Sequence, residues 1–143
     1  MTRGSVNTKY YVRRSGQFIY GKLDFLHAAF GIIPKLLDFW ESSLDSPSFD
    51  ISNELNPSFL LNYVLRKDFY LKQGEIANGS RKAKRIHVDT FLDMPIIVPC
   101  LNEQNKIGLS IEAITSLIAA NEQDLKLVIK IAKIFSFSIS ILN

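Results

Sequence analysis

The chain has 143 residues, of which 47% are hydrophobic, and its 17 Lys and Arg residues outnumber its 14 Asp and Glu residues by three charges. This length indicates one domain, or one domain with an appendage, and the apolar content excludes a disordered chain. A single Cys excludes an intrachain disulfide framework, and the longest uncharged segment, residues 55–65, is shorter than the roughly 20 apolar residues that cross a bilayer. With no apolar run after Met1, we expect a cytoplasmic protein.

Short, irregular elements are predicted for the first half of the chain. Residues 9–14 and 17–22 are rich in aromatic and β-branched side chains, and a Ser-Gly turn signal between them favours a β-hairpin. The apolar residues 30–33, which end at Pro34, predict a further strand. Residues 42–47 have the composition of a loop.

A helix is predicted to begin after residue 55. Asn56 suits the N-cap, Pro57 suits the first helical position, and the pattern continues to residue 70. Residues 74–80 then indicate a loop and residues 86–88 a short extended piece. Residues 94–98 predict a strand that ends at Pro99.

After Pro99 the pattern changes to that of one long helix, with Asn102 as a plausible N-cap. Nine positions then follow one another at alternating steps of four and three: Ile107, Ile111, Ile114, Ile118, Asn121, Leu125, Val128, Ala132 and Phe135. Eight of the nine are apolar, which is typical of a coiled-coil seam. Asn121 either fixes the register inside the seam or faces water on a slightly rotated helix.

This helix needs a partner. Residues 102–135 would form a rod about 51 Å long, more than a domain of this size covers with its own surface. Further apolar residues broaden the stripe in its second half and indicate more than one neighbour there. Residues 135–142 fit both a continuing helix and an alternating strand, and the pattern does not decide between them.

The charges are unevenly distributed along the chain. Residues 1–23 carry a net charge of +5, residues 24–63 carry −5, residues 64–85 carry +5 and residues 86–143 carry −2. Two basic blocks on either side of an acidic one indicate a surface for a polyanion, provided that the fold brings the blocks together. The alternative is a set of solvated surface charges.

The strongest binding signal is the loop after Gly79, which holds a hydroxyl and four cations within six residues. Lysines can serve as point charges for phosphates, and arginines can also form paired hydrogen bonds to guanine. A solubilising surface loop is the alternative. The candidate DNA-binding residues are those of this loop and three cations of the first basic block: Ser80, Arg81, Lys82, Lys84, Arg85, Arg13, Arg14 and Lys22.

Signs of catalysis are weak. The glycines do not form a phosphate-binding loop, and His27 and His87 have no partner at metal-ligand spacing. Cys100 is better explained as a small packing residue than as a nucleophile. We therefore expect no catalytic residue, no metal site and no cofactor.

Several segments, in order, resemble the specificity subunit of type I restriction–modification enzymes. Residues 80–99 look like the end of a target-recognition domain. They are followed by Glu103-Gln104-Asn-Lys106-Ile107, which is similar to the Glu-Gln-x-Lys-Ile signature that opens the family's long spacer helix. Upstream, residues 11–22 resemble the family's segment around a Gly-Asp turn, with Gln17 where Asp is usual.

The resemblance implies an α+β protein: an irregular mixed α/β target-recognition domain in residues 1–100 that lacks its N-terminal strands, a coiled-coil spacer helix in residues 101–136 and a tail in residues 137–143. It implies a non-catalytic, sequence-specific DNA-binding module that directs methyltransferase and restriction subunits to a half-site. The implied partners are double-stranded DNA, those two kinds of subunit, and a second recognition domain or second copy that pairs antiparallel through the helix.

Two other hypotheses remain open. The chain could be a coiled-coil protein-interaction module whose basic blocks are incidental, because the seam alone explains a protein partner. It could also be a non-functional fragment without specific DNA binding, which would melt broadly and without cooperativity.

Overall fold

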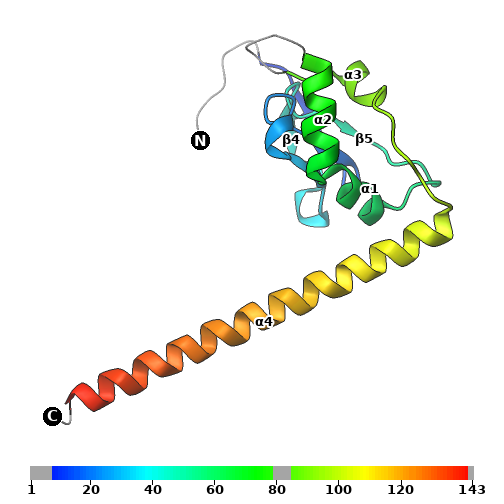
Figure 1. The fold of residues 1–143 in the computed structure, drawn as a ribbon. Coiled ribbons are helices and arrows are strands. Elements are labelled where there is room, and N and C mark those ends of the chain that lie inside the picture. Colours follow the sequence, from blue (N-terminus) through cyan, green and yellow to red (C-terminus); the bar gives the residue numbers. More distant parts are fainter. Residues whose placement is uncertain (1–7, 79–84, 142–143) are drawn as a thin grey trace. The chain divides into compact units, whose positions relative to one another are not determined.

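A computed structural model describes residues 8–78 and 85–141, and it shows a mixed α and β protein with small antiparallel sheets and a long C-terminal helix (Figure 1). The chain divides into two compact units, Met1–Asn105 and Lys106–Asn143, called unit 1 and unit 2 below. The expected combination of a mixed domain and a long helix is therefore confirmed. Pairing of that helix with another remains a prediction.

Unit 1 contains two small antiparallel sheets. The first is a two-stranded ribbon of β1, Tyr10–Val12, and β4, Glu41–Ser43. The second has β2, Phe18–Tyr20, at its centre, between β3, Phe30–Ile32, and β5, Ser48–Phe49. The strand predicted for residues 30–33 is thus present as β3.

The predicted hairpin of residues 9–14 with residues 17–22 is wrong in its pairing. The turn exists, and Gly16 occupies it with φ of +85°. However, β2 pairs with β3 and β5, whereas β1 pairs with β4. The reason is burial: Phe18 and Tyr20 are 2% and 1% exposed, so β2 must lie at the centre of the packed sheet, whereas every residue of β1 is exposed.

Short helices complete unit 1. Two 3₁₀ turns, η1 and η2, precede three α-helices, with bounds Phe25–His27 (η1), Lys35–Leu37 (η2), Pro57–Val64 (α1), Lys67–Asn78 (α2) and Val88–Leu92 (α3). The predicted N-cap of α1 is confirmed, because the Asn56 side chain accepts a hydrogen bond of 2.9 Å from the amide of Phe59.

The helix predicted through residue 70 is in fact two helices. The chain turns at residues 65–66, and the new direction of α2 brings Phe69 and Tyr70 into the core at 5% and 9% exposed. The loop predicted from residue 74 is also wrong up to residue 78, because α2 continues there. Gly74 lies against Phe25 and Leu26 of η1. Its lack of a side chain lets α2 pack closely on η1, and the glycine does not mark a loop.

Two further predictions need correction. Residues 94–98 form no strand, because no described strand pairs with them; Ile97 is 83% exposed and its amide donates to the Tyr63 hydroxyl at 3.1 Å. The extended piece predicted for residues 86–88 ends earlier, since Val88 already begins α3. The short apolar run of residues 94–98 therefore predicted a strand where the fold provides no partner.

Aromatic side chains form the core of unit 1. Its buried members are Phe18, Tyr20, Phe25, Val64, Phe69, Tyr70 and Ile86. The Tyr20 ring stacks on Phe91 with ring centroids 4.5 Å apart, and its hydroxyl donates to the Ile86 carbonyl at 3.0 Å. Burial and the nearby charge of Asp89 raise the pKa of the Tyr20 hydroxyl. Tyr20 thus attaches the chain at residues 86–91 to the central strand.

Helix α4 spans Leu101–Ile141. It begins one residue before Asn102, so Asn102 is not the N-cap. Its first five residues belong to unit 1 and the rest to unit 2. The helix passes the predicted end at residue 136 and includes residues 137–141, since a helix satisfies its own backbone hydrogen bonds whereas a strand needs a neighbour.

Candidate nucleic-acid interface

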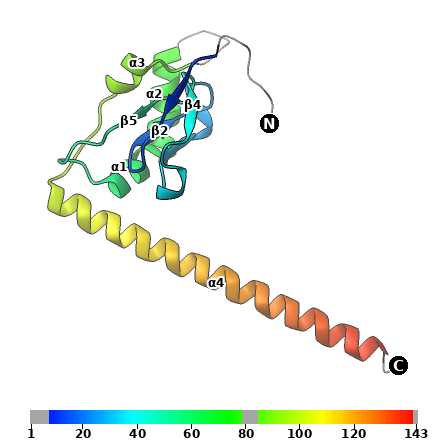
Figure 2. The same cartoon turned by 180° about the vertical axis from the view of Figure 1, so that it is seen from behind.

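The β1–β4 ribbon presents an exposed edge strand. Tyr10, Tyr11 and Val12 are 52%, 39% and 52% exposed, although their side chains are large and apolar in part. The ribbon faces the viewer in Figure 2, whereas α2 faces the viewer in the opposite view of Figure 1. Antiparallel ribbons of this kind are narrow enough to enter the major groove of DNA.

Arg13 follows β1 and uses its guanidinium inside the fold. Its Nε donates to the Ser42 hydroxyl at 2.7 Å, and Nη1 donates to the Ser48 hydroxyl at 3.3 Å. Nη2 donates to the carbonyls of Ser43 at 3.3 Å and Ser46 at 2.9 Å. Partial burial lowers the pKa of Arg13, against a smaller opposing effect of Tyr11. Arg13 therefore holds the turn after β4 rather than presenting free donors.

Lys22 and Arg85 meet at the same turn. The Lys22 amide donates to the Asp45 carbonyl at 2.8 Å, and the Lys22 carbonyl accepts from the Ile86 amide at 3.0 Å. The Arg85 guanidinium forms an ion pair of 3.1 Å with the Asp45 carboxylate. The fold therefore brings one member of each basic block to one place, a condition that the polyanion hypothesis required.

Arg14 follows the C-terminal end of β1, at the end of the ribbon opposite to the turn after β4. Its guanidinium is 3.8 Å from the centre of the Phe39 ring. This residue is exposed, and its charge stays available to solvent. Of the remaining candidates, Ser80, Arg81, Lys82 and Lys84 lie outside the described residues. Among the described candidates, Arg13, Lys22 and Arg85 converge on residues 42–48, and Arg14 is separate from them.

Sequence reasoning missed the role of Gln104, which is 1% exposed. Its Oε1 accepts from the Asn56 amide at 2.9 Å, and its Nε2 donates to the carbonyls of Glu54 and Pro99, each at 3.0 Å. This side chain therefore fixes the first turn of α4 to the N-terminus of α1, within unit 1. The Glu-Gln-x-Lys-Ile pattern marked the position, but nothing in it indicated which polar residue would be buried.

The predicted seam lies on an unburied helix. Five of its residues are between 40% and 61% exposed: Ile107, Ile114, Ile118, Leu125 and Val128. Asn121 and Ala132 are exposed as well, Ile111 is partly buried, and the side chain of Phe135 lies outside the described residues. Most of the described seam residues are thus exposed apolar side chains along one stripe of α4.

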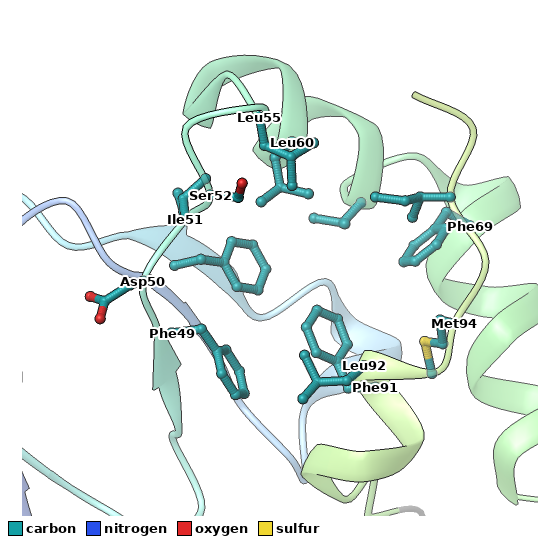
Figure 3. A pocket seen from close by; sticks show the side chains of 13 residues that line it. Phe49, Asp50, Ile51, Ser52, Leu55, Leu60, Phe69, Phe91, Leu92 and Met94 are labelled. Carbon is teal, nitrogen blue, oxygen red and sulfur yellow. The ribbon is translucent and has the colours of Figure 1, made fainter. Parts of the chain in front are cut away.

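A hollow of about 290 Å³ opens into the core of unit 1 beside β5 and α3 (Figure 3). Its walls are mainly apolar and include Phe18, Phe49, Phe69 and Phe91. The Asp50 side chain points away from these rings in Figure 3 and accepts from the Gln17 side chain at 2.9 Å. The lining is therefore poor in the positioned polar groups that orient a small ligand, with Asp50 and Ser52 as its polar residues.

Comparisons with known protein families, with curated proteins and with solved structures found no match. Within residues 8–78 and 85–141, no helix combines the length and the apolar character needed to cross a membrane. The same residues contain no group of three or more His, Cys, Asp or Glu placed to hold a metal ion. The family resemblance consequently rests on the sequence segments alone.

Proposed function

We propose that the chain is a non-catalytic, sequence-specific DNA-binding module of a type I restriction–modification system, which directs methyltransferase and restriction subunits to a half-site. The observation that carries the proposal is the exposed β1–β4 ribbon with cations at both of its ends. Lys22 and Arg85 lie beside the turn after β4, and Arg14 follows β1. The ordered resemblance to specificity subunits gives the same function.

Each cation has a distinct part in this proposal. Lys22 and Arg85 contact phosphates, since the exposed Arg85–Asp45 pair stabilises the fold little and a phosphate can replace the carboxylate. Arg13 acts as a positioning residue for the turn. The side chains of β1 lie in the major groove, where base edges are distinguishable. The loop residues 80–84 remain sequence-based candidates beside Arg85.

Helix α4 supplies the partner contact in this proposal, by pairing with a second copy or with a second recognition domain. Its charges after Lys106 support an antiparallel pair, because from there on acids precede bases along the helix: Glu112, Glu122 and Asp124, then Lys126, Lys130 and Lys133. Asn121 is the middle one of the nine seam positions, so two antiparallel copies would place it opposite itself. Two facing amides can exchange hydrogen bonds.

A salt titration tests DNA binding by the full-length chain. Sites are first selected from a randomised duplex, and the affinity of Lys22→Gln/Arg85→Gln is then measured against ionic strength. Removing two phosphate contacts should reduce the slope of log K against log salt by about 2. The matched control is Lys67→Gln/Lys72→Gln, which removes two exposed cations of α2, a helix that faces the viewer in Figure 1 whereas the ribbon faces the viewer in Figure 2.

Equal affinities and equal slopes for the two double variants would refute the proposed interface. Absence of any selected sequence, with retained folding, would refute sequence-specific DNA binding altogether. A second set of substitutions, Arg81→Gln, Lys82→Gln, Lys84→Gln and Arg85→Gln, tests the loop, and unchanged binding there would remove the loop from the interface.

The second candidate function is a protein-interaction module without DNA affinity. The exposed apolar stripe of α4 favours it directly, since such a stripe is stable only when covered. Analytical ultracentrifugation and a DNA shift assay on the same sample separate the two candidates. Self-association without a DNA shift at any salt concentration supports this second function and contradicts the first.

A further inference from the structure

Residues 36–40, called the aromatic loop below, expose three large apolar side chains at the surface of unit 1. Leu36, Phe39 and Trp40 are 87%, 62% and 64% exposed. Single exposed apolar residues are ordinary, whereas three within five consecutive residues indicate a candidate contact surface. The loop leads directly into β4, so it lies at the end of the ribbon where Arg13 and Arg14 follow β1.

The backbone of the loop is held firmly. The Phe39 amide donates to the Arg13 carbonyl at 2.9 Å, and the Arg13 amide donates to the Trp40 carbonyl at 2.7 Å. The Asp38 carboxylate accepts from the Ser15 amide at 2.9 Å. The exposed side chains are therefore preorganised, which lowers the entropy lost when they bind a partner.

Phe39 has a left-handed backbone conformation with φ of +64°. This conformation is unfavourable for a bulky residue by roughly 1–2 kcal/mol, and the side chain does not offset that strain by entering the core. The strain instead directs an aromatic ring toward solvent. A strained, exposed aromatic residue is typical of a contact surface rather than of a packing solution.

The charges beside the loop favour a nucleic acid over an acidic or neutral protein surface. Arg14 lies over the Phe39 ring at 3.8 Å, and Lys35 is exposed at the start of η2. The acid within the loop, Asp38, already accepts a backbone hydrogen bond, and Glu41 is the exposed acid that follows it. Aromatic rings with flanking cations stack on bases and neutralise adjacent phosphates.

We infer that the aromatic loop is a base-stacking element: Trp40 and Phe39 stack on bases that are unstacked at a kinked step of the duplex, while Arg14 and Lys35 contact the flanking phosphates. The inference rests on the proposed DNA-binding function. The inference adds a second DNA contact, at the opposite end of the ribbon from Lys22 and Arg85. It also adds a deformation of the DNA at the base step that the aromatic loop contacts.

The chain contains a single Trp, so its intrinsic fluorescence reports on the loop without any substitution. The full-length chain is titrated with its selected duplex, and the emission of Trp40 and its quenching by acrylamide are followed. Stacking should quench the emission and protect the ring from acrylamide. A series of duplexes with 2-aminopurine at successive positions should show a rise in base fluorescence at one step, where the bases are unstacked.

Substitutions in the aromatic loop measure how much the loop contributes to the affinity for DNA. Trp40→Ala should weaken DNA binding about tenfold, and Trp40→Phe should restore most of it, because a ring remains to stack. The matched control is Ile76→Ala, which removes another exposed apolar side chain, from α2, and should leave the affinity unchanged. Near-UV circular dichroism verifies that each variant is folded.

The outcomes separate the two proposals. DNA binding with unchanged Trp40 emission, or with no 2-aminopurine response at any position, overturns the stacking inference and leaves the DNA-binding function standing. Loss of binding to a methyltransferase subunit in Trp40→Ala, with full DNA affinity, also overturns it and makes the loop a protein contact. A folded chain without DNA affinity overturns the proposed function on which the inference rests.

Discussion

Unit 1 and the remainder of α4 use apolar side chains in opposite ways. In unit 1 the aromatic rings of Phe18, Tyr20 and Phe25 are at most 2% exposed; Tyr20 contacts Phe25, and all three rings contact Phe91. In unit 2 the side chains of Leu117 and Leu125 are more than 60% exposed on a single helix. Burial therefore stabilises the first region by itself, whereas the second gains comparable stability only from a partner.

Unit 1 therefore concerns the stability of the folded chain, whereas the part of α4 in unit 2 concerns association with a partner. The buried hydrogen-bonding side chain Gln104 stands in unit 1 at the start of α4 and is fully satisfied there. From Lys106 onward the helix depends on its own backbone and on surface side chains. Substitutions in the first region should therefore change the free energy of unfolding, and those in the second should change association.

The largest effect is expected from Phe25→Ala. Phe25 is 0% exposed and lies edge-on to Phe30 with ring centroids 5.0 Å apart. Its truncation leaves a cavity and should lower the free energy of unfolding by about 4 kcal/mol. Urea denaturation measures the change, with Leu36→Ala, an 87% exposed site, as the control that should change it little. A small effect at Phe25 would contradict the core described for unit 1.

Gln104→Ala should lower the free energy of unfolding by about 3 kcal/mol. The substitution leaves the Asn56 amide and the carbonyls of Glu54 and Pro99 without their partner, and each such loss is worth about 1–3 kcal/mol unless water enters. Thermal and urea melts give the value. Asn102→Ala, an exposed neighbour in the same helical turn, is the control. Equal stability of the two variants would remove Gln104 from the role assigned to it.

Ile118→Asp should weaken self-association through α4 about a hundredfold, or about 2.7 kcal/mol, without altering unit 1. Ile118 is 54% exposed in the single chain, so the isolated fold tolerates the change, whereas a paired seam would bury the charge. Sedimentation measures association, and near-UV circular dichroism monitors unit 1. Gln123→Asp, between the seam positions 121 and 125, is the matched control. Equal association constants would exclude the seam.

The smallest effect is expected from Tyr20→Phe, at about 1 kcal/mol near pH 7, because the Ile86 carbonyl loses its donor. The pH dependence sharpens the test. The folded pKa of Tyr20 is raised above its ordinary value near 10, so the stability from the neutral phenol is complete below that pH and is lost as the pH rises further. Tyr20→Phe should lose less stability than the native chain between pH 10 and 11.

The exposed Tyr11→Phe provides the comparison, since its hydroxyl is in no described hydrogen bond. Near pH 7 the free energy of unfolding of Tyr11→Phe should be close to that of the native chain. If Tyr11→Phe flattened the alkaline curve as strongly as Tyr20→Phe, the alkaline loss would come from general charge repulsion rather than from the buried phenol.

Sequence patterns predicted correctly those elements whose formation depends only on residues near them in the chain. The cap at Asn56, the strand that ends before Pro34 and the long helix after Pro99 follow from capping, proline and periodicity, which involve neighbouring residues only. Partners distant in the chain were not predictable in this way. The pairing of β1 with residues 41–43 and the burial of Gln104 among residues 54–56 and 99 depend on which surfaces meet.

By itself the sequence determined the mixed composition of the fold, the helix with its apolar stripe and the two basic blocks, because propensity, period and charge are properties of the chain alone. Only the tertiary structure decided that Arg13 serves the fold, that Lys22 and Arg85 share one turn, and that Phe39 and Trp40 face solvent beside Arg14. The physical reason is that a polar or aromatic side chain acquires its role from the groups that the fold places next to it.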